Sequence, residues 1–262
     1  MEALILYRVV PINAFTDNYI WALVGDNQKC AIVDPGDANP VLAKIKQYDW
    51  QLTEILLTHH HADHIGGVAT LLEAFPDCRV VGPGSSRFSK LCEPLAEGDR
   101  VTLIATNSEF QVLELFGHTR DHIGFVDDAN AFVGDTLFSI GCGRLFEGTA
   151  QQLFDSLGKL KALPETTQIF CAHEYTLANL EFALAVEPEN TGLVEYQSQV
   201  LDWLSKEQAS IPTNIKREKA LNPFLRLHEE KLRQRVQQKF KAQTALTPAK
   251  AFELLRKWKD TF

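Results

Sequence analysis

The segment THHHADH, residues 58–64, packs four candidate metal ligands into six residues. It follows the apolar run 55–57 and precedes two glycines, an order that predicts a buried strand, a polar loop and the start of a helix. Alternate side chains of an extended backbone share a face, so His59 and His61 are expected to point together. Imidazole and carboxylate groups suit zinc, iron or manganese. The segment therefore predicts a metal site at the end of a strand, and a chance histidine run on a solvated loop is the alternative.

Three more ligand-type residues stand at the ends of probable strands. His118 follows the alternating run 108–116, Asp135 follows the apolar run 131–133, and His173 follows the run 168–172. Sites in α/β folds lie at the carboxyl ends of strands. Alone, such a histidine is more often structural and such an aspartate more often a cap or turn residue. One metal takes about four to six donors, so the combined set indicates two metals that share a bridging carboxylate: His59, His61, Asp63, His64, His118, Asp135 and His173.

The H-x-H-x-D-H signature with the later His, Asp and His resembles the metallo-β-lactamase superfamily. Other stretches resemble glyoxalase II, the hydroxyacylglutathione hydrolases, and run in family order along nearly the whole chain. They are DNY (17–19), GDTLF (134–138), GCGR (141–144), EGT (147–149), HEYT (173–176) and NPFLR (222–226). The metal signature indicates only the superfamily, whereas GCGR, HEYT and NPFLR point to glyoxalase II.

Pattern and resemblance predict the same organisation. Up to residue 173, apolar runs alternate with turn signals and two helix-like segments, 68–75 and 151–163. Beyond it helical patterns dominate, at 177–186, 193–206, 228–241 and 249–259, and Thr247-Pro248 forms a probable start of the last one. The resemblance implies an α+β fold, a metallo-β-lactamase-like four-layer αβ/βα sandwich. We expect a catalytic domain over residues 1–173 and a helical substrate-binding domain over residues 174–262.

The resemblance also implies how the metals are held. One ion would be bound by His59, His61 and His118, the other by Asp63, His64 and His173, and Asp135 would bridge the two. Zinc is expected, with iron or manganese as alternatives. A metal-bound hydroxide held by Asp63 and Asp135 would attack a thioester carbonyl. His122 is expected to orient a ligand by a hydrogen bond, and an ordinary packed or surface histidine is the alternative.

By the same resemblance, glutathione is bound by Arg144, Phe146, Tyr175 and Arg226. Many family members have Tyr in place of Phe146, a basic residue in place of Glu229 or Glu230, and Gly in place of Asp121. The implied reaction is hydrolysis of S-(2-hydroxyacyl)glutathione, typically S-D-lactoylglutathione, the second step of methylglyoxal detoxification. The alternatives are a glutathione-persulfide dioxygenase, another hydrolase on the same scaffold, or a nucleic-acid-processing protein.

Composition predicts a compact cytoplasmic enzyme. The chain has 262 residues, 45% hydrophobic and 23% charged, which is enough to bury a sizeable core. Five scattered cysteines without a C-x-x-C pair suggest reduced thiols. We find no signal-peptide pattern and no apolar window near the ~18 residues of a membrane span. We expect a monomer that does not bind membranes.

Charge is divided unevenly along the chain. Residues 1–215 hold 13 Lys and Arg against 29 Asp and Glu, a net charge of −16, whereas residues 216–262 hold 13 against 5, a net charge of +8. Nucleic acid is not expected as a partner, because the pI is about 5.5 and no aromatic residues are interleaved with the basic ones. A small anionic substrate needs only one or two of these cations, and the others are expected to be solvated.

Overall fold

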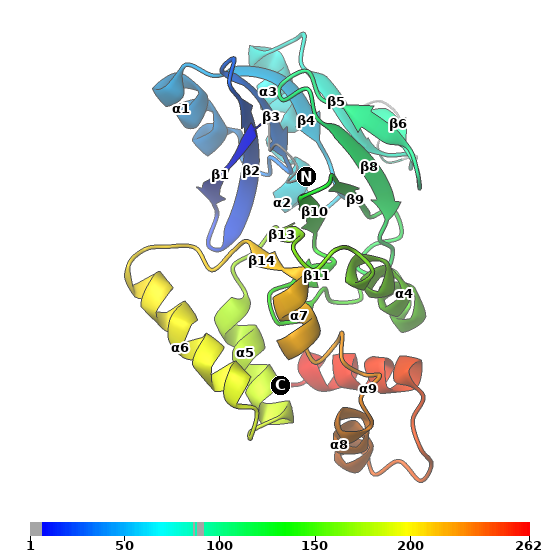
Figure 1. Cartoon of the computed structure of the whole chain (residues 1–262). Helices are drawn as coiled ribbons and strands as arrows, with labels where there is room; N and C mark the ends of the chain where they lie inside the picture. Colours follow the sequence, from blue (N-terminus) through cyan, green and yellow to red (C-terminus); the bar gives the residue numbers. More distant parts are fainter. Residues whose placement is uncertain (1–6, 86, 88–91) are drawn as a thin grey trace. The chain divides into compact units, whose positions relative to one another are not determined.

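The computed structural model describes residues 7–85, 87 and 92–262; residues 1–6, where the search for a targeting signal begins, lie outside the described residues. The chain forms two compact units, which Figure 1 shows in sequence colours. The first unit holds Met1–Leu115 and Asp121–Gly134, and the second holds Phe116–Arg120 and Asp135–Phe262. This division reflects spatial contacts, and the expected domain boundary after residue 173 stays a prediction.

A six-stranded mixed sheet is the main element of the first unit. In order across the sheet it contains β1 (Tyr7–Ala14), β2 (Asn18–Gly25), β3 (Lys29–Val33), β4 (Gln51–Leu56), β5 (Arg79–Pro83) and β6 (Glu93–Leu95). The β1–β2 and β2–β3 pairs are antiparallel, and the remaining pairs are parallel. Every residue of β2 is buried, as expected of a strand covered on both faces. The predicted strand before residue 58 is confirmed by β4.

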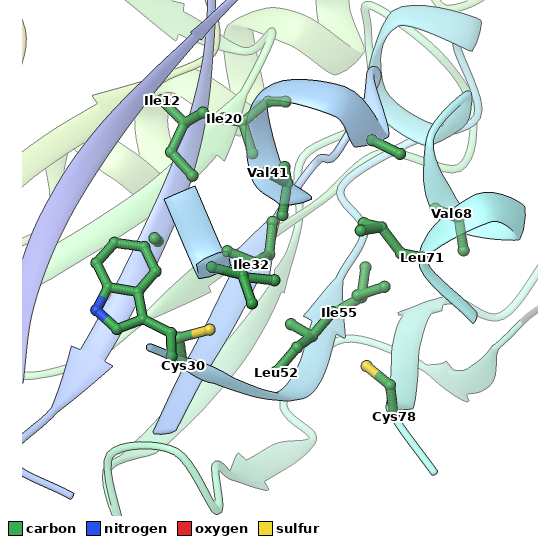
Figure 2. Close-up of a cluster of buried hydrophobic side chains, with 14 of the residues drawn as sticks. Ile12, Ile20, Cys30, Ile32, Val41, Leu52, Ile55, Val68, Leu71 and Cys78 are labelled. Atoms are coloured by element: carbon green, nitrogen blue, oxygen red, sulfur yellow. The ribbon is translucent and has the colours of Figure 1, made fainter. Parts of the chain in front are cut away.

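Helices cover one face of this sheet. They are α1 (Ala38–Tyr48), the short α2 (Ala62–Ile65) and α3 (Val68–Ala74). Figure 2 shows Val41 of α1 and Val68 and Leu71 of α3 in the core that also holds strand residues such as Ile32 and Ile55. The prediction of a helix at 68–75 is confirmed. Helix α1 was not predicted, although Asp37 marks its start by accepting a hydrogen bond from Asn39 N at 2.9 Å.

Four antiparallel strands of the first unit form another layer. They pair in the order β10 (Asn130–Gly134), β9 (Ile123–Val126), β8 (Glu109–Glu114) and β7 (Arg100–Thr102). The two layers meet through aromatic contacts, since the rings of Tyr7 in β1 and Phe110 in β8 lie 6.0 Å apart. Glu54 of β4 is fully buried and accepts hydrogen bonds from the backbone N–H groups of Ile104 and Ala105. The first unit therefore contains three layers: the helices, the six-stranded sheet and the four antiparallel strands.

The second unit is mostly helical. It contains β11 (Leu137–Phe138), β12 (Gly141–Cys142), α4 (Ala150–Lys161), β13 (Gln168–Cys171), α5 (Thr176–Val186), α6 (Thr191–Ser205), β14 (Thr213–Asn214), α7 (Ile215–Leu221), α8 (Glu230–Phe240) and α9 (Pro248–Asp260). The helices predicted after residue 174 are confirmed, and α7 is an addition. Thr247 caps α9 by accepting from Lys250 N, with Pro248 at the first helical position as predicted. Among the described helices, none has the length and apolar character needed to cross a bilayer.

Candidate metal centre and substrate pocket

The THHHADH segment of the first unit forms a tight imidazole cluster. The ring centroids of His59 and His61 lie 4.6 Å apart, and those of His59 and His64 lie 4.0 Å apart. His61 ends the extended loop, and Asp63 and His64 lie in α2, as the predicted turn into a helix requires. His59 and His64 are fully buried. The predicted approach of His59 and His61 is therefore confirmed.

Asp34, which sequence reasoning missed, organises this cluster. Its buried carboxylate accepts hydrogen bonds from Thr58 N at 2.8 Å and Thr58 Oγ1 at 2.7 Å, and it pairs with His64 Nδ1 at 2.9 Å. A carboxylate on Nδ1 orients a metal-binding imidazole and raises its basicity. The opposite ring atom, His64 Nε2, lies 3.5 Å from Asp63 Oδ2. Asp34 stands directly after β3, which is the sequence signal that could have identified it.

Neighbouring polar residues hold the other members of the cluster. Asn18, from the DNY stretch, donates from Nδ2 to Asp63 Oδ2 at 3.1 Å. His60 turns aside and pairs through Nδ1 with Asp121 at 2.9 Å, so Asp121 has a partner at the position where many family members have Gly. His122 is fully buried and stacks on His59, with 4.7 Å between ring centroids. Its expected hydrogen bond to a ligand stays a prediction.

Glycine is required at position 134, where β10 ends just before Asp135. The backbone there has a φ of +46°, which glycine adopts at little cost. A Cβ atom on this residue would lie 2.5 Å from Thr58 Oγ1 and 2.7 Å from His122 Nε2. The Gly-Asp pair therefore lets the strand end close to the imidazole cluster.

The second unit brings together His118, Asp135 and His173. Asp135 Oδ2 lies 3.3 Å from His118 Nε2, and Asp135 Oδ1 lies 3.4 Å from His173 Nε2. The other ring nitrogen of His118, Nδ1, is 2.8 Å from the carbonyl oxygen of Arg144. All three residues are buried. The two carboxylate oxygens of Asp135 thus face different histidines, as a bridging ligand would.

These separations fit metal ligands. With metal–nitrogen and metal–oxygen bonds of about 2.0–2.2 Å, two ligand atoms at a tetrahedral angle lie about 3.3–3.5 Å apart. The pairs His118–Asp135, His173–Asp135 and His64–Asp63 lie at 3.3, 3.4 and 3.5 Å. Imidazole nitrogens and carboxylate oxygens without thiolate suit zinc, iron or manganese. Of the candidate ligands, four lie in the first unit and three in the second.

A pocket of about 300 Å³ opens beside His118 and Asp135 in the second unit, and it is lined by Phe138, Cys142, Arg144, Phe146, Tyr175, Asn179, Arg256 and Lys259 as well. Three of the four residues predicted to bind glutathione are among them. The ring of Tyr175 stacks on His173 at 4.7 Å, and Phe146 meets His118 edge-on at 5.2 Å. The structure therefore gathers Arg144, Phe146 and Tyr175 around two candidate metal ligands.

Two cations of this pocket were missed by sequence reasoning. Arg256 is buried and donates from Nη1 to the carbonyl oxygen of Cys142 at 2.9 Å. Burial and the positive charge of Arg256 lower the pKa of Lys259 to about 8. Both residues lie on α9, three positions apart, so they share one helix face. That spacing within the basic carboxy-terminal segment is the signal that could have identified them.

Arg226 is placed differently from the other predicted substrate residues. It is buried and does not line the pocket described above. Its guanidinium donates to both carboxylate oxygens of Glu187, at 2.7 and 3.1 Å, and to Glu229, at 2.7 and 2.9 Å. Glu229, unusual at the sequence level, is thus an ion-pair partner of Arg226. These contacts favour a structural role, and its contact with glutathione stays a prediction.

Two family models match consecutive parts of the chain. The model of the metallo-beta-lactamase superfamily matches residues 17–173, and the model of the hydroxyacylglutathione hydrolase C-terminus matches residues 174–262. The hydroxyacylglutathione hydrolase of Aliivibrio salmonicida (strain LFI1238) is 49% identical over 259 residues, covering 99% of this chain and 100% of that protein.

Solved structures share the fold. The crystal structure of ETHE1 from Myxococcus xanthus has a TM-score of 0.63 at 23% identity and covers 97% of this chain and 98% of that chain. TTHA1623 in a di-iron-bound form has a TM-score of 0.60 at 26% identity and covers 83% of this chain and 100% of that chain. The expected metallo-β-lactamase fold with a helical carboxy-terminal region is confirmed. With both family models and a full-length relative in agreement, the chain belongs to the hydroxyacylglutathione hydrolase family, glyoxalase II, within the metallo-β-lactamase superfamily.

Proposed function

We propose that this protein hydrolyses S-(2-hydroxyacyl)glutathione thioesters, typically S-D-lactoylglutathione, to glutathione and a 2-hydroxy acid. The observation that carries this proposal is the pocket of the second unit, where Arg144, Arg256 and Lys259 line the same cavity as His118 and Asp135. Glutathione carries two carboxylates, and cationic donors bind carboxylates strongly. Hydroxyacylglutathione hydrolase activity also follows from family membership.

The proposed metal centre uses the seven candidate ligands predicted from the sequence. One ion would be held by His59, His61 and His118, the other by Asp63, His64 and His173, with Asp135 shared by both. Zinc is proposed, and iron or manganese would suit the same donors; the di-iron form of the structural neighbour TTHA1623 is a property of that protein. Bound there, two such ions would make hydroxide available from water at neutral pH and polarise the thioester carbonyl.

The side chains divide the remaining tasks between binding and orientation. Asp63 and Asp135 are acceptors that hold and orient the attacking water. Arg144, Arg256 and Lys259, which line the pocket, would bind the glutathione carboxylates. Tyr175 and Phe146, whose rings contact His173 and His118, would flank the tripeptide. The leaving group is a thiolate with a pKa of about 8.5. Such a group can leave as an anion near neutral pH, so the reaction needs little help from a general acid.

A hydrolysis assay on the purified, metal-loaded protein tests this function. We expect loss of the S-D-lactoylglutathione thioester with stoichiometric release of free thiol, and close to two metal ions per chain. Asp135→Ala should lose both ions and nearly all activity, whereas His64→Ala should mainly empty one site. Oxygen consumption with glutathione persulfide, in the absence of thioester cleavage, would refute the hydrolase and favour the dioxygenase. A fully active Asp135→Ala protein would refute the shared carboxylate.

The cellular setting is proposed from the thiols. Cys30, Cys78, Cys142 and Cys171 are buried, and Cys92 is partly buried. Burial raises the pKa of the Cys30 and Cys78 thiols to about 12, which makes both unreactive. We propose the reducing cytoplasm as the compartment. The monomeric state stays a prediction, which light scattering of the purified protein tests.

A further inference from the structure

The turn between β11 and β12 carries backbone strain close to the pocket. Ile140 has a φ of 59°, in the left-handed region that a β-branched residue rarely adopts. Its side chain is fully buried in a cluster with residues of α5 and α6, including Leu180 and Tyr196. A strained residue of this kind persists only where its surroundings hold it in place.

Three buried side chains hold this turn, one at each residue. Glu218 accepts a hydrogen bond from Ile140 N at 2.9 Å. Asn222 donates from Nδ2 to the carbonyl oxygen of Gly141 at 3.0 Å. Asn179 donates in the same way to the carbonyl oxygen of Ser139 at 2.9 Å. The turn is therefore fixed by polar contacts from α5 and α7.

Glu218 is the centre of this network. It is fully buried, and besides Ile140 N its carboxylate accepts from Thr213 Oγ1 at 2.7 Å and from Asn222 Nδ2 at 2.8 Å. Two of these partners, Ile140 N and Asn222 Nδ2, can only donate, and both bond to Oε2, so this oxygen must be an acceptor. Burial raises the pKa of Glu218 to about 7, and the facing charge is that of Arg217, whose guanidinium lies over the Tyr196 ring at 4.5 Å.

The residues on either side of the turn form a wall of the substrate pocket. Phe138 of β11, Cys142 of β12 and Arg144 just beyond it all line the cavity. Asn179 lines it too, and a Cβ atom on Gly141 would lie 2.5 Å from the Asn179 amide, so the turn and α5 are in close contact. A change in the turn would therefore move the pocket wall.

We propose that Glu218 is a positioning residue for glutathione binding: it holds the strained turn at residues 139–141 and, through it, the pocket wall that carries Phe138 and Arg144. This inference rests on the proposed function, because it concerns binding of the glutathione part of the substrate. It assigns no role to Glu218 in the chemical step.

Titration calorimetry with S-methylglutathione, a thioether that cannot be hydrolysed, tests the proposal on metal-loaded protein. For Glu218→Leu, which accepts none of the three hydrogen bonds, we expect Kd and KM to rise about tenfold. Metal content and kcat should stay near the wild-type values. Glu54→Leu is the matched control, because Glu54 is equally buried and also accepts from two backbone N–H groups and a threonine hydroxyl. It should lose stability but keep the wild-type Kd.

Thr213→Val gives a second measurement should Glu218→Leu fail to fold. It removes the hydroxyl that bonds to Glu218 Oε1 at 2.7 Å and should raise Kd by a smaller factor than Glu218→Leu. An unchanged Kd in Glu218→Leu, an unchanged Kd in Thr213→Val, or an equal rise of Kd in Glu54→Leu would overturn the inference. If the wild-type protein neither binds S-methylglutathione nor cleaves the thioester, the proposed function itself is wrong.

Discussion

Lys259 should make substrate binding sensitive to alkaline pH. Its pKa is lowered from 10.5 to about 8, first by burial and then by Arg256, while Cys142, Glu181 and Asp260 act in the opposite direction. Only the ammonium form attracts a glutathione carboxylate. With a pKa of about 8, the charged fraction falls from about nine-tenths at pH 7 to about one-tenth at pH 9, so KM should rise about tenfold over this range. Substrate binding stabilises the ammonium, so kcat should change much less.

Steady-state kinetics with S-D-lactoylglutathione between pH 6.5 and about 9.5 measures this effect. Lys259→Arg keeps its charge throughout and should flatten the alkaline rise of KM. Lys259→Met should show a high KM at all pH values, by roughly tenfold at pH 7, because a hydrogen bond to a charged group contributes about 1.5–3 kcal/mol. If the alkaline rise of KM persists unchanged in Lys259→Arg, Lys259 is not the titrating group. The rise would then belong to the substrate's own amine.

Three further outcomes test the architecture. Asp34→Asn should lower metal affinity by about 10- to 100-fold, measured by chelator competition, because Asp34 orients the His64 imidazole. Arg226→Met should lower the free energy of unfolding by about 3 kcal/mol and leave KM unchanged, because Glu187 would be left buried without its cation; a tenfold rise in KM at unchanged stability would instead support a substrate contact. Gly134→Ala should lower both Tm and metal content, because its Cβ would lie 2.5 Å from Thr58 Oγ1.

Local sequence determined the elements that carry the candidate metal ligands. Apolar runs followed by turn residues predicted the strands ending before residues 58, 135 and 173, and alternation along the backbone predicted the approach of His59 and His61. Thr247-Pro248 predicted the start of α9 for an equally local reason, since a cap and a missing N–H are properties of neighbouring residues. The family resemblance rested on such short motifs and was confirmed by family models that match residues 17–262.

Contacts between distant residues were decided by tertiary structure alone. Arg226 and Arg256 belong to the same basic segment, and both are buried and paired with a carboxylate, Glu187 and Asp260, yet Arg256 lines the pocket and Arg226 does not. In the sequence, Asp34 looks like a turn residue. Only the tertiary structure shows that its Oδ2 lies 2.9 Å from His64 Nδ1. The partners of a long charged side chain depend on which helices and loops pack around it, and that packing involves residues far apart along the chain. Periodicity reveals which face of an element is buried, but it does not reveal which charge that face will meet.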